Sequence, residues 1–285
     1  MRWHRWGLIG VLLVMTAAAV ATFAEKPTRP ENSDQTVFLP IVARPQIPVI
    51  KLFQVQPAAA DPGQTVTLSW EVEHADEVTL IRFWDFRPAQ WWTDLPLVGS
   101  QEYTVPASER NPVNFMLDAY DAASGVRVNA GVSVHVICPD TWFFNPAPSG
   151  CPTAPLYSAA AEQSFEGGYM IWLGVENRII VLFTDNNYPK MANYTDSWSG
   201  EPICNLGPPP AGKLYPERGF GKIWCEFPAV RDRLGWATEP ETGYETILQR
   251  TTMVKYNHTY LLAADGNVWH LLAENSGWEK IVTTP

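Results

Sequence analysis

Two stretches in which apolar and polar side chains alternate strictly constrain the fold of this chain most. In residues 65–72, and again in residues 126–136, every second position carries an apolar side chain. Successive side chains of a β-strand point to opposite faces of a sheet, so a period of two predicts half-buried strands. Residues 113–120 repeat the pattern, and Asp-Pro-Gly and Gly-containing turn signals lie between the three stretches. We therefore predict a β-sandwich over residues 47–137.

The segment Pro62-Gly63-Gln64-Thr65-Val66-Thr67-Leu68-Ser69-Trp70 refines this prediction. It resembles the second strand of the immunoglobulin-like domains found in exported bacterial proteins. The resemblance implies an immunoglobulin-like β-sandwich of about 90 residues. Because one fold hosts many functions, it implies a fold and no activity.

The first 24 residues are typical of a targeting segment. Arg2 and Arg5 precede an uncharged apolar run over residues 7–24, which ends in small residues suited to cleavage before Glu25. We predict a cleaved signal peptide, with a retained membrane anchor as the alternative. Residues 25–46 form a proline-rich linker, whose apolar patch at residues 37–42 could donate a strand to another chain. Either way, the rest of the chain is expected outside the cytoplasm.

Export gives meaning to the four cysteines, because disulfides persist in oxidising compartments. Four cysteines allow three pairings. We expect the local one, Cys138 with Cys151 and Cys204 with Cys225, and each bridge should stabilise the fold by about 3 kcal/mol. A metal site is the alternative, but the chain has no Cys-x-x-Cys or Cys/His cluster to support it.

Residues 138–285 are predicted to form a second, disulfide-stapled β-rich domain, so the expected fold class is all-β. A hairpin is expected around a turn at residues 174–177, with an apolar strand over residues 178–183. A weaker copy over residues 248–272 suggests a repeat of hairpins. Residues 219–237 combine two glycine-aromatic turns, a cysteine and Leu-Gly-Trp-Ala, and we predict that they form the turn region of this β unit.

Two motifs of the second domain resemble the LGFP-type repeat of bacterial envelope proteins. Phe165-Glu166-Gly167-Gly168 with Trp172 matches one half, and Leu234-Gly235-Trp236-Ala237-Thr238-Glu239 the other. Ala237 stands where the family has proline, and Arg250 and Thr251 stand where the second unit would carry a glycine pair. The resemblance implies a noncatalytic module associated with the cell wall.

Aromatic side chains are the candidate ligand-binding residues. Four of them lie in one short segment: Trp84, Phe86, Trp91 and Trp92. They either cover a sheet edge or pack on the next domain, or they form an exposed platform for sugars or a protein partner. In the second domain the candidates are Trp172, Trp224 and Trp236.

Charge and motifs exclude several function classes. The formal net charge of −10 argues against nucleic acid and anionic lipid as partners. No nucleophile elbow, zinc motif or phosphate-binding glycine loop occurs, and no cofactor or metal is expected. We predict an exported, non-enzymatic binding module for a cell-wall or extracellular glycan or a protein. The alternatives are a wall hydrolase using Glu162, Glu166 or Asp185, and a purely structural spacer.

Overall fold

The computed structural model describes residues 46–202, 204 and 206–283. The predicted targeting segment, the linker and the candidate donor strand at residues 37–42 lie outside the described residues. All described residues belong to one compact unit, Pro45–Pro285. Among the described residues, strands far outnumber helices, with sixteen strands against two short α-helices, which confirms the all-β class.

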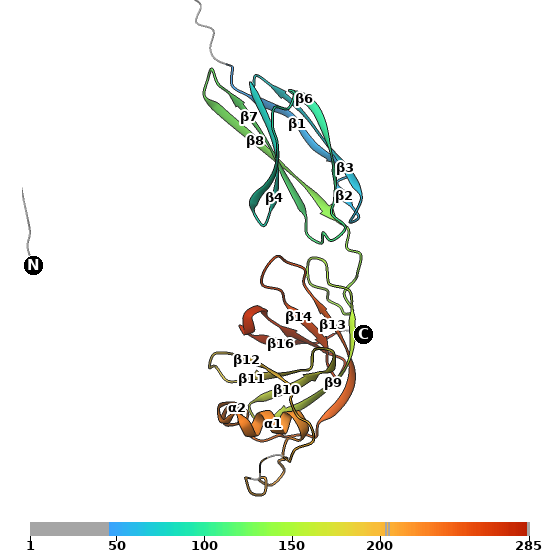
Figure 1. Cartoon of the computed structure of the whole chain (residues 1–285), viewed down its shortest axis with the longest axis vertical. Coiled ribbons are helices and arrows are strands. Elements are labelled where there is room, and N and C mark those ends of the chain that lie inside the picture. Colours follow the sequence, from blue (N-terminus) through green and yellow to red (C-terminus); the bar gives the residue numbers. More distant parts are fainter. Residues whose placement is uncertain (1–45, 203, 205, 284–285) are drawn as a thin grey trace, which may run out of the picture. The chain divides into compact units, whose positions relative to one another are not determined.

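The N-terminal half of this unit contains two sheets (Figure 1). One sheet has the order β1-β3-β6, from Val49–Gln56, Thr65–Glu73 and Val98–Thr104. The other has the order β2-β8-β7-β4-β5, from Ala59–Ala60, Val126–Val136, Val113–Asp121, Glu77–Trp84 and Arg87–Trp92. The three strands predicted from alternation are β3, β7 and β8.

One hydrophobic core joins these two sheets. It buries the alternating residues of β3 and β7, together with the last residues of β8: Val66, Leu68, Trp70, Val72, Val113, Phe115, Leu117, Ala119, Val134 and Val136. His135, between the last two, is exposed. The inward and outward faces therefore follow the period of two, as expected for strands with one face in a core.

The C-terminal half is built on one eight-stranded sheet with the order β12-β11-β10-β9-β13-β14-β15-β16. The bounds are Leu156–Phe165 for β9, Gly168–Leu173 for β10, Arg178–Phe183 for β11, Met191–Thr195 for β12, Thr242–Arg250 for β13, Thr259–Leu262 for β14, Val268–Leu271 for β15 and Trp278–Ile281 for β16. Two runs of four consecutive antiparallel strands thus meet where β9 pairs with β13.

This sheet curls back on itself. The indole nitrogen of Trp278 in β16 donates a hydrogen bond to the carbonyl of Phe183 in β11 at 3.0 Å. Asn193 of the edge strand β12 donates to Asn275, which precedes the other edge strand, at 2.7 Å. Ile171 and Ile180 of the first run share a core with Leu261 and Trp269 of the second, so the curl encloses apolar side chains.

The predicted hairpin is present with a correction to its strands. The turn falls at a short 3-10 helix, η1 (Gly174–Glu176), and β11 follows as expected. However, the segment that leads to this turn contains two strands, because Glu166 and Gly167 form a further turn between β9 and β10. The strands of the proposed second copy also differ from the prediction. Residues 248–250 end β13, and the next strand, β14, starts at residue 259.

The prediction that residues 219–237 form the turn region of a β unit is wrong. Arg218–Glu226 is helix α1 and Pro228–Leu234 is helix α2. Two glycines weaken the helix propensity of α1, so its stability comes from packing. Phe220, Ile223 and Trp224, at helical spacing, are buried against β9–β11. The helices therefore cover one face of the curled sheet.

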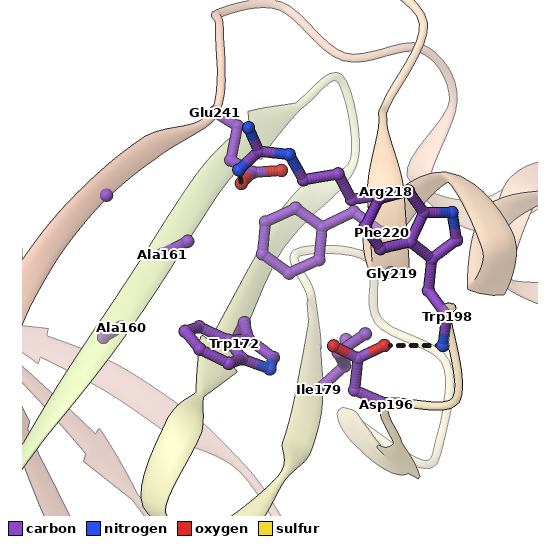
Figure 2. A pocket seen from close by; sticks show the side chains of 11 residues that line it. Ala160, Ala161, Trp172, Ile179, Asp196, Trp198, Arg218, Gly219, Phe220 and Glu241 are labelled. Atoms are coloured by element: carbon purple, nitrogen blue, oxygen red, sulfur yellow. Dashed lines mark hydrogen bonds and ion pairs between the residues drawn. The ribbon is translucent and has the colours of Figure 1, made fainter. Parts of the chain in front are cut away.

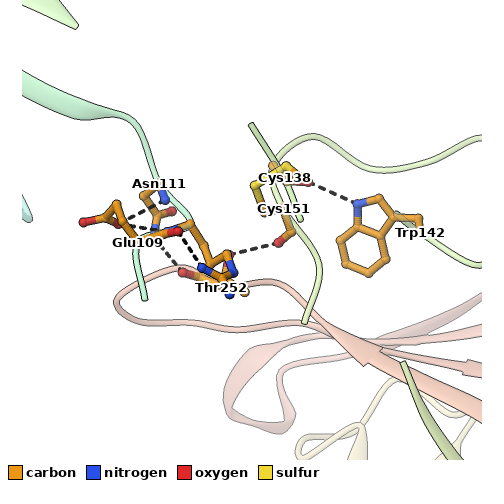
Figure 3. Close-up of a disulfide and its surroundings, with 8 residues drawn as sticks. Glu109, Asn111, Cys138, Trp142, Cys151 and Thr252 are labelled. Carbon is orange, nitrogen blue, oxygen red and sulfur yellow. Dashed lines mark hydrogen bonds between the residues drawn. A yellow bond between two sulfur atoms is a disulfide. The ribbon is translucent and has the colours of Figure 1, made fainter. Parts of the chain in front are cut away.

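Both disulfides have the predicted local pairing, Cys138–Cys151 and Cys204–Cys225. Around the first bridge, Thr252 donates its hydroxyl to the carbonyl of Cys151 at 2.9 Å, and Trp142 donates to the carbonyl of Gly150 at 3.1 Å (Figure 3). The bridge thus fixes the loop that leads into the eight-stranded sheet. Among the described residues, no helix has the length and apolarity needed to cross a bilayer.

Candidate functional site

A cavity of about 370 Å³ opens on the sheet face that helix α1 covers (Figure 2). Strands β9–β11 contribute its floor, helix α1 one wall, and the segments after β12 and before β13 the remaining rim. The lining residues are Ala160, Ala161, Trp172, Ile179, Asp196, Trp198, Arg218, Gly219, Phe220, Glu241 and Gly243. Its volume lies at the lower end of the roughly 300–1,000 Å³ typical of small-molecule sites.

Strand register creates the floor of the cavity. Gly243 of β13 lies opposite Ala161 of β9, Ala161 lies opposite Trp172 of β10, and Trp172 lies opposite Ile179 of β11. Residues directly opposite one another across strands share a sheet face. A glycine and an alanine beside a tryptophan leave unfilled space over the sheet. The cavity therefore exists because two small residues flank one large ring.

Helix α1 forms the wall at its first turn, where Gly219 permits a close approach. A Cβ atom at this position would lie 2.6 Å from Oδ1 of Asp196 and 2.8 Å from Cδ1 of Ile179. Two hydrogen bonds with Asn177 hold Asp196 in place. The backbone N–H of Asp196 donates to the carbonyl of Asn177, and Nδ2 of Asn177 donates to the carbonyl of Asp196, both at 3.0 Å. The missing side chain thus lets this carboxylate sit against the start of the helix.

Trp198 forms the outer rim and is 37% exposed. Its indole nitrogen donates to the carbonyl of Glu201 at 3.0 Å, and its backbone N–H donates to Oδ1 of Asp196 at 3.1 Å. Lys222 of helix α1 holds the same loop through the Ser197 carbonyl at 3.0 Å and an ion pair with Glu201. The Cys204–Cys225 bridge adds a covalent tie to the end of α1.

The rim carries two carboxylates and one cation. Nη1 of Arg218 lies 3.3 Å from Oε1 of Glu241. Burial raises the pKa of Glu241, the charge of Arg218 opposes this shift, and the charges of Glu217 and Asp196 reinforce it. The Glu241 side chain is only 20% exposed, whereas that of Arg218 is 66% exposed. The site thus combines an apolar floor with a rim of hydrogen-bonding groups of net negative charge.

Of the aromatic candidates in this half, Trp172 lines the cavity and two others do not. Trp224 is buried, and its indole nitrogen donates to the carbonyl of Gly235 at 2.8 Å. Trp236 packs against Trp224 with ring centroids 5.0 Å apart. Both rings hold helices α1 and α2 to the sheet. By contrast, Nε1 of Trp172 is buried without a hydrogen-bond partner among the described residues.

The four aromatics near residue 84 take different positions. Trp84 ends β4, Phe86 lies in the turn, and Trp91 and Trp92 belong to the edge strand β5. Trp92 packs on the core against Tyr103 and Phe115. Phe86, Trp91 and Trp84 are 94%, 55% and 45% exposed. Trp91 and Trp92, as neighbours in a strand, face opposite sides of the sheet, so these rings do not form one flat platform.

The three acids proposed for hydrolysis each have a partner outside the cavity. Glu162 accepts the indole hydrogen of Trp269 at 2.9 Å. Glu166 pairs with Lys213 at 2.9 Å. Asp185 receives two hydrogen bonds from Arg233. None of the three lines the cavity over Trp172, whereas Glu241 and Asp196 do.

The histidines of the C-terminal half form a chain that ends at a carboxylate. Nδ1 of His258 lies 2.7 Å from Nε2 of His270, and Nδ1 of His270 lies 2.6 Å from Oε1 of Glu279. Tyr260 stacks on His270 with centroids 4.4 Å apart. Within the described residues, no group of three or more His, Cys, Asp or Glu side chains could hold a metal ion.

Comparisons of the chain with protein-family models, curated proteins and solved structures gave no match. A function for this chain therefore has to be inferred from the geometry of the site. Of the residues that line the cavity, the sequence predicted Trp172 as a ligand-binding candidate but not Ala161, Gly243 or Glu241. No local motif marks these residues, and only the strand register brings them beside the tryptophan.

Proposed function

We propose that this chain is an exported, non-enzymatic binding protein and that the cavity over Trp172 holds a glycan. The observation that carries the proposal is the row Gly243–Ala161–Trp172, which places an indole ring in the floor of an open cavity. A sugar ring has an apolar C–H face that stacks on an aromatic ring. Its hydroxyl groups can donate to carboxylates such as Asp196 and Glu241 and accept from Arg218.

The size and lining of the cavity favour a glycan over a protein partner. Small-molecule sites are mostly apolar and have a few placed polar groups, which is the pattern here. Protein interfaces are broad surfaces that bury about 800 Å² on each partner. This site is instead a concave cavity with a volume of about 370 Å³. An anionic glycan is disfavoured because the rim carries more acids than bases.

Two disulfides support a location outside the cytoplasm, where such bonds persist. We further propose that residues 1–24 direct secretion and that residues 47–137 form an immunoglobulin-like spacer. In this arrangement the spacer presents the glycan-binding half to a cell wall or an extracellular polymer, as the resemblance to envelope repeats implies.

The test is glycan binding by a variant in which the cavity is filled. Gly243 is an exposed strand residue, and a Cβ there meets only the Ala160 carbonyl at 3.9 Å, so Gly243→Val should preserve the fold. The wild-type chain is screened on purified cell wall and on arrayed neutral oligosaccharides, and hits are measured by calorimetry. We expect Gly243→Val and Trp198→Ala to weaken binding at least tenfold, or about 1.4 kcal/mol.

Two matched substitutions locate the binding surface. Gly131→Val places the same side chain on an exposed glycine of β8, where a Cβ would lie 3.7 Å from the Phe115 carbonyl. Trp91→Ala removes an exposed ring of β5. Both should bind like the wild type. Loss of binding in Trp91→Ala alone would assign the ligand to the β4–β5 edge, and a wild type that binds no glycan would refute the proposal.

A wall hydrolase is the second candidate, and one observation favours it. The raised pKa of Glu241 suits a general acid, and Asp196 lines the same cavity. In this function Glu241 would protonate the glycosidic oxygen and Asp196 would serve as the second carboxylate. Prolonged incubation with the bound oligosaccharide separates the two functions. New reducing ends that disappear in Glu241→Gln would establish the hydrolase, and an intact ligand would support binding alone.

A further inference from the structure

A second cavity of about 380 Å³ adjoins the first. Its lining consists of Gln163, Leu214, Tyr215, Glu217, Arg218, Pro240 and Glu241. Arg218 and Glu241 line both cavities. The ion pair between them therefore stands at the boundary, and the two cavities form one groove along the side of helix α1 and the start of β13.

Gln163 gives the second cavity an unused hydrogen-bond acceptor. This β9 residue is 3% exposed, and its Nε2 donates to the carbonyl of Glu239 at 3.0 Å. Its Oε1 is buried and has no partner among the described residues. A buried polar atom without a partner costs free energy, because it has lost its hydrogen bonds to water. A donor group from a ligand would remove this cost.

The boundary residue Arg218 is poised to contact a ligand in either cavity. Its side chain is 66% exposed, so its ion pair with Glu241 is weakly held. Its backbone has a φ of 51°, an uncommon conformation for a residue other than glycine. Such backbone strain is often found at ligand-binding positions. Glu217, Glu241 and Asp196 outnumber this single cation along the groove.

We propose that the two cavities are adjacent subsites for a linear, uncharged oligosaccharide of at least two sugar units. One unit stacks on Trp172, and the next donates a hydroxyl or amide hydrogen to Oε1 of Gln163. Arg218 contacts the linkage between them. This inference rests on the proposed glycan binding at the first cavity.

The experiment compares ligands of increasing length on the full chain. The probes are β-1,4-linked glucose and N-acetylglucosamine series from mono- to hexasaccharides, with an oligouronate as the charged counterpart. The wild type should bind a disaccharide or trisaccharide at least tenfold more tightly than the monosaccharide, and the oligouronate more weakly than either neutral series.

Two variants test the second subsite separately. Gln163→Met removes the acceptor with little change of shape, and Leu214→Trp narrows the cavity from a residue that is 39% exposed. Both should lose the tenfold gain with length while binding the monosaccharide like the wild type. Circular dichroism and thermal melting establish that each variant is folded; should Gln163→Met be unfolded, Leu214→Trp supplies the test.

The outcomes separate this inference from the proposed function. Monosaccharide binding without any gain from length in the wild type would overturn the second subsite and leave the first intact. A gain that survives in a folded Leu214→Trp variant would place the extra contacts elsewhere and also overturn it. Absence of binding to every probe would refute both.

Discussion

The side chain of Glu166 accepts a hydrogen bond from the backbone N–H of Trp236 at 2.9 Å, across 70 positions of sequence. The N–H of Gly167 donates to the carbonyl of Leu234 at 2.7 Å. The motifs at residues 165–168 and 234–239 therefore contact each other, and this contact ties the β9–β10 turn to the end of helix α2.

This contact should make stability depend on pH. The hydrogen bond from the Trp236 N–H lowers the pKa of Glu166. The hydrogen bond and charge of Lys213 lower it further. A carboxylate whose pKa is lower in the folded state stabilises the fold above its unfolded pKa, about 4.3, and loses this contribution as pH falls through its folded pKa. Glu166→Gln should therefore be less stable than the wild type at pH 7, with a difference that shrinks towards pH 3.

Urea unfolding at several pH values measures this effect. Glu102→Gln changes an exposed carboxylate of β6 and serves as the control, which should follow the wild type closely. An equal difference between Glu166→Gln and wild type at pH 7 and pH 3 would contradict the assigned role.

Gly167 should tolerate no side chain. A Cβ atom would lie 2.1 Å from the carbonyl oxygen of Arg233, which is backbone and cannot move freely. We expect Gly167→Ala to lower the free energy of unfolding by about 2–4 kcal/mol, since relieving the overlap requires the turn to shift. Gly243→Ala, which meets its nearest atom at 3.9 Å, should change it by less than about 0.5 kcal/mol. Similar values for both variants, measured in urea, would refute the steric argument.

The two disulfides should differ in their effect on binding. Replacing Cys204 and Cys225 by serine removes the covalent tie between the Trp198 loop and helix α1, so affinity for the proposed glycan should fall along with about 3 kcal/mol of stability. Replacing Cys138 and Cys151 should cost comparable stability without loss of affinity, because that bridge lies away from the cavity lining. Calorimetry at a temperature where both variants are folded decides between these outcomes.

Glu241→Gln should separate stability from function. Burial raises the pKa of Glu241, so its ionised form destabilises the folded state above the unfolded pKa, and stability rises as pH falls through the raised value. The variant should melt at a slightly higher temperature than wild type at pH 7, with a smaller difference at pH 4, while binding is weakened. Glu245→Gln, which changes an exposed carboxylate of β13 outside the cavity lining, is the matched control. A lower melting temperature at pH 7 would show that the Arg218 ion pair outweighs burial.

The aromatic segment of β4 and β5 should divide into structural and exposed rings. Trp92→Ala removes a ring that packs on Tyr103 and Phe115, and it should lower the free energy of unfolding by about 2–3 kcal/mol. Phe86→Ala, at a side chain that is 94% exposed, should stay within about 0.5 kcal/mol of wild type. Chemical denaturation measures both, and equal losses would contradict the assigned packing.

The strands of the first half and both disulfides could be predicted from the sequence. Strict alternation in β3, β7 and β8 identifies which side chains enter the core, because the period of a strand is two wherever one face is buried. The short spacing within each cysteine pair favoured the two bridges that are present.

Tertiary structure decided the helices and the site. Helix α1 carries two glycines and forms because Phe220, Ile223 and Trp224 are buried on the sheet, a signal at helical spacing that the glycine-aromatic pattern concealed. The cavity depends on register between β13, β9 and β10, which places Gly243 and Ala161 beside Trp172. Register is a relation between distant segments, so no local pattern along the chain could reveal it.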